Sequence, residues 1–247
     1  MADVELRTPQ VVSSGIAAVH AYSGLMAKEC LSAMSFAFRS EEFVSRYDVP
    51  SYELWLHAAD MRPAYEQHRR TLQVLQRDAE PKRWLLKCPV HQQNVPTILD
   101  VYPDARFSCT HRNPLSILPS VSSLIAQLRS AHSETVDTVG IGRYHVDLYS
   151  RTLDRYTDQV ESGLVGPDRL TNSTHRAFLD DAMAVTRGLY EHFGFELTDE
   201  TAARMEAYLA EHEEGRAGNA YDLRAFGIDT EAVRSRFARY SERFGVG

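Results

Sequence analysis

The chain has 247 residues, of which 43% are hydrophobic and 25% charged, a composition that fits one large globular α/β domain and excludes disordered and fibrous classes. The formal net charge of −7 argues against a general nucleic-acid binder, which needs an excess of lysine and arginine. No apolar run is long enough to cross a bilayer and no basic segment leads into an apolar one at the amino terminus, so we expect a cytoplasmic protein without a membrane span.

Apolar residues at helical spacing predict three helices in the first part of the chain. They cover residues 25–38, a short stretch from Ser51, and a stronger helix that starts near Asp60 and Pro63. In the last of these, Tyr65, His68, Leu72 and Leu75 form the expected inner face, and we interpret His68 as a packing histidine.

Two short apolar runs follow, and they predict a strand, a crossover helix and a second strand of a parallel sheet. The first strand covers residues 83–87 and the crossover residues 92–102, where Pro96 predicts a late helix start. The second strand precedes His111. Ligands of open α/β sheets lie beyond the carboxyl ends of the strands, where this sequence places Lys87, His91, His111 and Arg112.

The second strand leads into a helix that is expected to run to about Arg129. Asn113 can cap this helix and Pro114 suits its first turn, so free backbone amides and the positive end of the helix dipole would face outward beside Arg112. Phosphate or sulfate would fit there. A solvated surface arginine is the alternative interpretation of Arg112.

The rest of the chain is predicted to be mainly helical. Residues 131–140 show no clear element and are a candidate mobile segment above the site, and a long helix is expected over residues 143–161. Further helices are predicted over residues 176–193, closed by Gly194, and from Thr198 and Thr230 onward. The absence of repeats and composition shifts predicts a single domain over residues 1–247. Cys88 and Cys109 are expected to be buried free thiols, and the cysteine spacing predicts no metal site.

In combination, the motifs resemble the bacterial sulfotransferase-like family. Its Lys-Ser-Pro-x-His, Tyr-Pro-Asp-Ala and His-Arg-Asp-Pro signatures are similar to Lys87-Cys-Pro-Val-His91, Tyr102-Pro-Asp-Ala-Arg106 and His111-Arg-Asn-Pro114. Further landmarks match at Asp48-Val-Pro-Ser-Tyr52, Arg62-Pro-Ala-Tyr65, Leu189-Tyr-Glu-His-Phe-Gly194 and the closing Arg236-Phe-Ala-Arg-Tyr-Ser-Glu-Arg-Phe-Gly245. The resemblance covers nearly the whole chain from about residue 20.

The resemblance implies a P-loop-like α/β domain, with a small parallel sheet among many helices, that transfers a sulfuryl group from 3′-phosphoadenosine 5′-phosphosulfate to a hydroxyl or amine of a small-molecule acceptor. By the family pattern, Arg112 and Ser120 would hold the 3′-phosphate, and Lys87 would neutralise charge on the moving sulfuryl group. His91 would be the base. Arg216, in a loop that resembles the family's late glycine-basic segment, is a further candidate for the 3′-phosphate.

By the same resemblance, residues 169–174 would form a third family strand, and His175 falls where the family often has a tyrosine near the adenine.

Three features depart from the family pattern. The family opens with a strand and a Gly-x-x-Arg-Ser-Gly-Thr phosphosulfate loop, and the nearest stretch, Ser13-Ser-Gly15, lacks the basic residue and the second glycine. We therefore expect the sequence to be truncated at its amino terminus relative to the family. Asn113 replaces the usual aspartate, a mild change because both residues cap helices well. Pro119 lies inside the predicted helix and would kink it just before Ser120.

Two functions fit this pattern. One is a sulfotransferase, and the other is a non-catalytic relative that keeps the fold and acts as a nucleotide-binding or structural partner. A kinase-like phosphoryl transferase lacks support because no Gly-Lys-Ser/Thr loop is present. A homodimer is possible, because a sheet edge exposed by the absent first strand invites pairing. The sequence does not identify the acceptor, and Phe43, Tyr52 and Trp55 are candidates to line its pocket.

Overall fold

The structure is a computed structural model that describes residues 27–80, 82–212 and 222–247. Its internal contacts divide the chain into two compact units. The first contains Met1–Pro103 and Val121–Ile141, and the second contains Asp104–Ser120 and Gly142–Gly247. Each unit is described by itself, and the single domain expected from the sequence stays a prediction.

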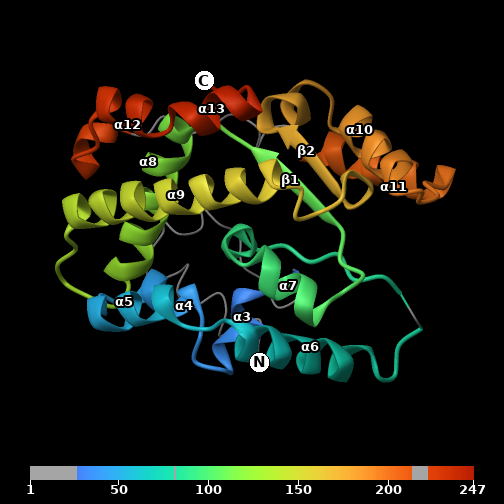
Figure 1. The fold of residues 1–247 in the computed structure, drawn as a ribbon, viewed down its shortest axis with the longest axis horizontal. Helices are drawn as coiled ribbons and strands as arrows, with labels where there is room; N and C mark the ends of the chain where they lie inside the picture. Colours follow the sequence, from blue (N-terminus) through green and yellow to red (C-terminus); the bar gives the residue numbers. More distant parts are fainter. Residues whose placement is uncertain (1–26, 81, 213–221) are drawn as a thin grey trace. The chain divides into compact units, whose positions relative to one another are not determined.

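The described part of the first unit is helical. Its elements are α3 (Leu31–Ser35), α4 (Glu41–Arg46), α5 (Pro50–Ala58), α6 (Arg62–Gln76), the 3-10 turn η1 (Pro89–Gln93), α7 (Val95–Val101) and the part of α8 (Pro114–Ser130) that follows Ser120. Helix α6 packs against α3 and α7 (Figure 1). Met34, Tyr65, Leu72 and Ile98 are buried among these helices and form much of their shared core.

Helix α6 begins where the sequence predicts. The Asp60 side chain accepts a hydrogen bond from the backbone N–H of Arg62 at 2.9 Å, and Pro63 occupies the first turn. Tyr65, His68 and Leu72 are buried as expected. Leu75, predicted on the same face, has 63% of its surface exposed, so this part of the prediction is wrong.

The strand predicted for residues 83–87 does not form. Within the described residues the sheet has two strands, and neither includes this segment, which has no regular secondary structure. Leu85 is 97% exposed, so the apolar run that predicted the strand is not buried in a sheet. The backbone N–H of Cys30 donates to the Lys87 carbonyl at 3.3 Å, an isolated contact with the α3 region. The helix predicted for residues 25–38 is likewise shorter than expected, because α3 covers only Leu31–Ser35 of its described part.

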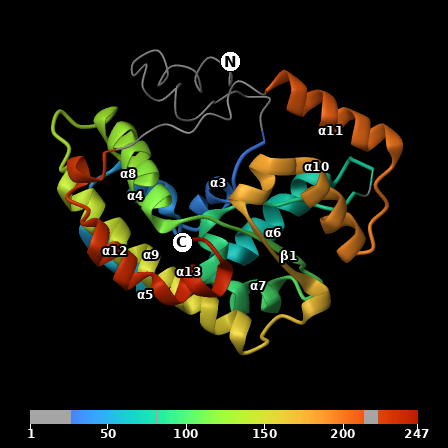
Figure 2. The ribbon, with the colours of Figure 1, turned by 90° about the horizontal axis from the view of Figure 1, so that it is seen from above.

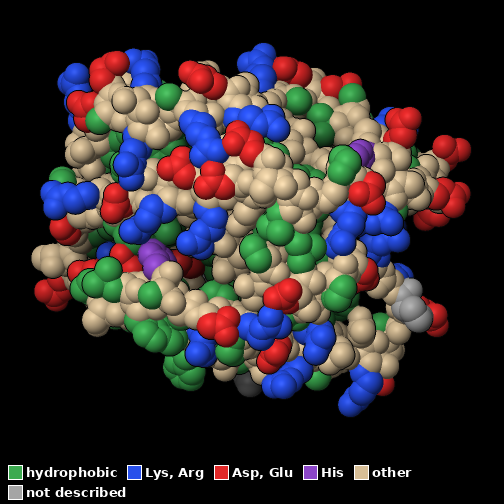
Figure 3. Space-filling model, in the orientation of Figure 1, with side chains coloured by type: hydrophobic (Ala, Val, Ile, Leu, Met, Phe, Trp, Pro, Cys, Tyr) green, Lys and Arg blue, Asp and Glu red, His purple; other side chains and the backbone are tan. Residues whose placement is uncertain are grey.

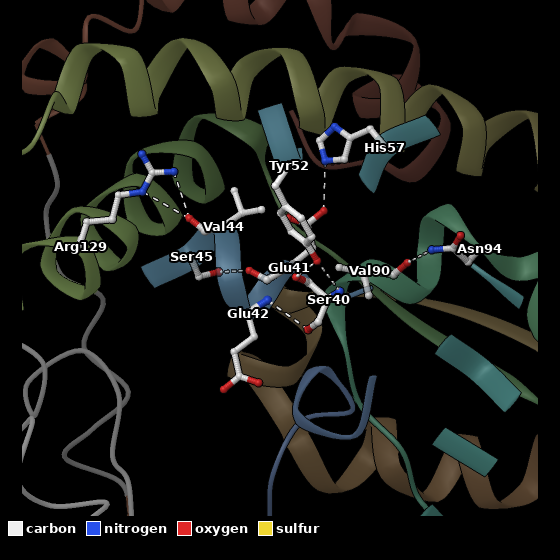
Figure 4. Close-up of polar contacts among 10 residues, drawn as sticks. All are labelled: Ser40, Glu41, Glu42, Val44, Ser45, Tyr52, His57, Val90, Asn94 and Arg129. Carbon is white, nitrogen blue, oxygen red and sulfur yellow. Dashed lines mark hydrogen bonds and ion pairs between the residues drawn. The ribbon is translucent and has the colours of Figure 1, made fainter. Parts of the chain in front are cut away.

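Polar contacts hold α4 within the first unit (Figure 4). The Ser40 hydroxyl accepts a hydrogen bond from the backbone N–H of Glu42 at 3.1 Å and so caps the helix. At the other end, Nη2 and Nε of Arg129 lie 3.0 and 3.3 Å from the carbonyl oxygen of Val44. Arg129 therefore satisfies a carbonyl that the end of a short helix leaves without an intrahelical partner.

The second unit contains the sheet. Its elements are β1 (Phe107–His111), the first residues of α8, α9 (Thr138–Glu161) from Gly142 onward, η2 (Pro167–Arg169), β2 (Leu170–Thr174), α10 (His175–His192), α11 (Asp199–Glu211), η4 (Leu223–Phe226), α12 (Thr230–Arg236) and α13 (Ala238–Phe244). Strands β1 and β2 are parallel and pair from Phe107 with Leu170 to His111 with Thr174. Helix α10 follows β2 without a loop and packs on the sheet (Figures 1 and 2). The polar stretch Leu170–Thr174 is thus a strand, as the resemblance implied.

Two helix boundaries differ from those predicted. Helix α9 starts at Thr138, so the end of the expected loop over residues 131–140 is helical. The carboxyl-terminal helix breaks at Phe237, whose φ of −106° and ψ of 11° separate α12 from α13. Helix α10 ends as predicted, with Gly194 in the left-handed conformation at φ 64°, which glycine adopts without a Cβ clash.

The fold class is the predicted one, a helix-rich α/β arrangement with a small parallel sheet. Positive and negative side chains are interspersed on the face in Figure 3, without one large basic field. None of the helices in the described ranges combines the length and apolar character that crossing a bilayer requires. Cys30, Cys88 and Cys109 are buried free thiols, as predicted for Cys88 and Cys109.

Candidate active site

Two helices of the second unit begin at the carboxyl ends of the two paired strands. Strand β1 ends at His111 and leads through Arg112 and Asn113 into α8, while β2 ends at Thr174 and continues directly as α10. The pairing register places His111 opposite Thr174, so the two helix starts share one edge of the sheet. In parallel sheets this edge is the usual ligand position.

Side chains cap both helix starts. Asn113 Oδ1 accepts a hydrogen bond from the backbone N–H of Leu115 at 2.8 Å, which confirms the predicted cap. The Thr174 hydroxyl accepts one from the backbone N–H of Ala177 at 3.2 Å. The remaining first-turn amides and the positive ends of two helix dipoles favour an anion at this edge.

Arg112 adds a positive charge at the same edge, and His175 lies near it. Burial, as the larger cause, and the positive charge of Arg112 lower the pKa of His175, so the imidazole is neutral in the free chain at pH 7. Within the described ranges, no carboxylate forms an ion pair with Arg112. Such a cation beside two helix starts can take an anionic ligand. His175 matches the family pattern only weakly, and no local pattern in the sequence shows that it follows β2 at the same sheet edge as Arg112.

His111 does not face a ligand, contrary to the expectation that it lies among the side chains at the strand ends. It is 1% exposed, and both ring nitrogens have partners, Tyr240 at 2.9 Å and Asn172 at 2.8 Å. No local pattern in the sequence indicates these contacts, because Tyr240 lies 129 positions further along the chain.

Ser120 and Arg216 are the other two residues predicted to contact the 3′-phosphate. Ser120 is partly buried on α8, and the helix runs through Pro119 without a break in its assigned range. Arg216 lies outside the described residues. The roles of Ser120 and Arg216 stay predictions.

Lys87 lies in the first unit, in the segment before η1. Its ammonium group forms an ion pair with the carboxylate of Glu29. The lysine side chain is 72% exposed, and exposed pairs of this kind contribute little free energy, so the ammonium group can exchange one anionic partner for another.

His91 lies in η1 and is oriented by a buried tyrosine. The Tyr65 hydroxyl oxygen lies 3.0 Å from Nδ1 of His91, and Tyr65 itself is 1% exposed. Burial, followed by the charge of nearby His68, lowers the pKa of His91 to about 4. The imidazole is therefore neutral at pH 7 and has a lone pair that can accept a proton.

A second histidine and tyrosine pair lies beside this one. Nδ1 of His68 is 2.6 Å from the Tyr102 hydroxyl, and that hydroxyl also lies 3.5 Å from the Tyr65 carbonyl oxygen. His68 is thus a satisfied packing histidine, as predicted. The sequence did not identify Tyr65 as the partner of His91 or Tyr102 as the partner of His68, although both tyrosines lie in family motifs.

Lys87 and His91 belong to one unit, and Arg112 and Ser120 belong to the other. Lys87 lies just before η1 and His91 lies within it, and Arg112 lies near His175 at two helix starts. The convergence of all four residues on one ligand stays a prediction.

Comparison with known proteins identifies the class of this α/β protein. The model of a family described as "Sulfotransferase family" matches residues 16–199. The chain therefore belongs to the sulfotransferase family, as its motifs predicted.

The chain is also similar to individual sulfotransferases from mycobacteria. It is 29% identical over 206 residues to proteins named omega-hydroxy-beta-dihydromenaquinone-9 sulfotransferase Stf3 from Mycobacterium bovis and Mycobacterium tuberculosis. This match covers 78% of the chain and 50% of each relative, so the chain spans about half the length of the curated relatives it matches.

Two crystal structures share the fold. Sulfotransferase STF9 from Mycobacterium avium has a TM-score of 0.82 and 31% sequence identity, over 92% of this chain and 60% of STF9. Sulfotransferase STF1 from Mycobacterium tuberculosis H37Rv has a TM-score of 0.81 and 26% identity, over 96% of this chain and 61% of STF1.

Proposed function

We propose that this chain carries the nucleotide-binding and proton-accepting parts of a sulfotransferase that uses 3′-phosphoadenosine 5′-phosphosulfate. The acceptor is a hydroxyl or amine of a small molecule. The main support is the edge of the β1–β2 sheet, where Arg112, His175 and the capped starts of α8 and α10 offer a seat for an anion. Family membership supports a sulfuryl donor as the source of that anion.

In this proposal, Arg112 binds the 3′-phosphate of the nucleotide, with Ser120 and Arg216 as further contacts. A guanidinium suits the role because its planar N–H groups match phosphate oxygens in pairs. The positive dipole ends of α8 and α10 add a preference for the anion that does not depend on a charged side chain. His175 contributes a second N–H donor.

The transfer step moves the sulfuryl group from the phosphate oxygen to the acceptor. The acceptor oxygen or nitrogen forms a bond to sulfur, the bond from sulfur to the phosphate oxygen breaks, and adenosine 3′,5′-bisphosphate leaves. Lys87 neutralises the charge that develops on the departing phosphate. His91 accepts the acceptor's proton at Nε2 when its Nδ1–H donates to the Tyr65 oxygen. The nearby anionic donor raises the basicity of His91.

Calorimetry with adenosine 3′,5′-bisphosphate tests the nucleotide site. We expect the unmodified chain to bind this ligand and Arg112→Ala to weaken binding by about 10-fold or more, since a charge-assisted contact is lost. Arg187→Ala is the matched control, because Arg187 lies on α10 and pairs with Glu206 at an exposed position. Absence of binding at millimolar nucleotide would contradict the proposal, and so would an equal loss of affinity in both variants. Transfer of radiolabelled sulfate from the donor then tests for turnover.

A non-catalytic nucleotide-binding protein is the second candidate function, and the ion pair between Lys87 and Glu29 favours it. In that case Lys87 contributes to the folded structure through its ion pair and takes no part in sulfuryl transfer. Glu29→Gln separates the two functions, because releasing Lys87 would raise the transfer rate of an enzyme and change nothing in a non-catalytic protein.

The acceptor and the cellular location also belong to the proposal. Phe43 and Tyr52 pack edge to face with ring centroids 5.7 Å apart, and Tyr52 and Trp55 follow at 5.5 Å. This aromatic row in the first unit is the proposed apolar lining for the acceptor. The three free thiols fit a reducing compartment such as the cytoplasm.

A further inference from the structure

A single tyrosine of the carboxyl-terminal helix α13 meets the end of β1. The Tyr240 hydroxyl lies 2.9 Å from Nδ1 of His111, at hydrogen-bonding distance. Burial raises the pKa of Tyr240, and the nearby backbone N–H of Arg112 opposes that rise. Tyr240 is 2% exposed, so its hydrogen bond with His111 does not compete freely with water. One side chain therefore lies against both residues at the turn between β1 and α8.

The second nitrogen of His111 fixes the direction of the hydrogen bond between His111 and Tyr240. Nε2 lies 2.8 Å from Oδ1 of Asn172, an atom that can only accept, so Nε2 carries the hydrogen. Burial lowers the pKa of His111, which keeps the ring neutral and leaves Nδ1 as an acceptor. The Tyr240 hydroxyl thus donates to Nδ1, and its oxygen lies near the backbone N–H of Arg112.

Two aromatic side chains complete the surroundings of His111. The Phe244 ring stacks on the imidazole with centroids 3.8 Å apart and planes 10° apart. The Tyr156 hydroxyl donates to the same Asn172 Oδ1 at 2.9 Å. The imidazole is therefore held by β2, α9 and α13 together, and it has no freedom to rotate without breaking several contacts.

We propose that Tyr240 is a positioning residue for nucleotide binding, which fixes the backbone at His111 and Arg112 so that the Arg112 guanidinium points at the ligand's 3′-phosphate. This inference rests on the proposed function. A bidentate contact needs the guanidinium in a narrow range of orientations, and a small backbone shift at residue 112 is amplified along the long side chain. Tyr240 touches neither the nucleotide nor the reacting atoms in this proposal.

The experiment compares two nucleotides that differ in the 3′-phosphate. Tyr240→Phe keeps the ring and removes the hydroxyl, so it loses the donor to His111 and the oxygen beside the Arg112 N–H. We expect its affinity for adenosine 3′,5′-bisphosphate to fall about 10-fold, with affinity for adenosine 5′-monophosphate unchanged. A general loss of structure would weaken both ligands alike.

Thr157→Val is the matched control for lost stability. The Thr157 hydroxyl is fully buried and donates to the Leu153 carbonyl at 2.8 Å within α9, so its removal also deletes one buried hydrogen bond. We expect this variant to bind both nucleotides like the unmodified chain. Nitrogen-15 spectra supply a readout without ligand, since loss of the Tyr240 donor must shift the Nδ1 resonance of His111.

The outcomes separate the positioning role from the nucleotide site itself. If the unmodified chain binds and Arg112→Ala does not, but Tyr240→Phe binds normally, the positioning role is overturned and the proposed function survives. If Tyr240→Phe loses affinity equally for both nucleotides, the positioning role is overturned and Tyr240 only stabilises the fold. If the unmodified chain does not bind adenosine 3′,5′-bisphosphate, the proposed function and the positioning role fail together.

Discussion

The hydroxyl oxygen of Tyr65 lies 3.0 Å from Nδ1 of His91, and this contact orients the proposed base of the sulfotransferase. Burial raises the pKa of Tyr65 well above its ordinary value, so the phenol stays neutral over the whole physiological range. It can therefore hold His91 in either protonation state without adding charge.

The first prediction concerns stability at acidic pH. The pKa of His91 is about 4 in the folded chain, against 6.5 for a free side chain. Between these values the unfolded state binds the proton more strongly, so folding stability falls as the pH decreases from about 6.5 toward 4. The loss attributable to His91 is up to about 3 kcal/mol.

Urea denaturation at several pH values measures this loss. His91→Gln should show a weaker decline of unfolding free energy with falling pH than the unmodified chain. His212→Gln, at an exposed position on the end of α11, is the control and should keep the full slope. Identical slopes for all three proteins would show that His91 does not carry the effect.

The second prediction concerns pH and nucleotide affinity. Burial and the charge of Arg112 lower the pKa of His175 in the free chain, and a bound phosphate would favour its protonated form. Protonation of His175 should therefore increase the affinity for adenosine 3′,5′-bisphosphate as the pH decreases. His175→Ala should not show this increase. Calorimetry measures the affinity of both proteins for the same ligand. The titration of the ligand's own phosphate affects both proteins equally, so it does not contribute to the difference between them. Parallel pH profiles for the two proteins would place His175 away from the phosphate.

The third prediction concerns Arg129. Its guanidinium donates to the Val44 carbonyl and lies 3.2 Å from the Asp48 carboxylate, with a side chain that is only 12% exposed. Arg129→Met should lower the free energy of unfolding by about 2 kcal/mol, because a buried carbonyl loses a charged donor. Arg46→Met removes an exposed pair with Glu42 and should cost well under 1 kcal/mol, or about 0.5. Equal costs in urea denaturation would contradict this account.

The fourth prediction compares two helical glycines. A Cβ on Gly142 would lie 2.0 Å from the backbone oxygen of Phe226, so Gly142→Ala must displace main chain in α9 or η4 and should cost about 2 kcal/mol or more. A Cβ on Gly188 in α10 would meet nothing within 4 Å. Gly188→Ala should therefore stabilise the chain by about 0.5–1 kcal/mol through helix propensity. Thermal denaturation of the two variants should shift in opposite directions, and a shift of the same sign would refute the contact with Phe226.

The sequence alone determined the local features of this protein. Helical periodicity and capping chemistry located α6, α8 and α10, because the caps at Asp60 and Asn113 and the stop at Gly194 depend on neighbours within a few residues. The motifs around Lys87, His91 and Arg112 also identified the family, since they are short and contiguous.

The tertiary structure decided which of these local features meet. An apolar run becomes a strand only if another strand pairs with it, and residues 83–87 have no place in the described sheet, while the polar run Leu170–Thr174 pairs with β1 over its full length. The pairing of His111 with Tyr240, and of Tyr65 with His91, joins residues that lie far apart in the chain. Such contacts depend on packing between elements, which no local pattern in the sequence encodes.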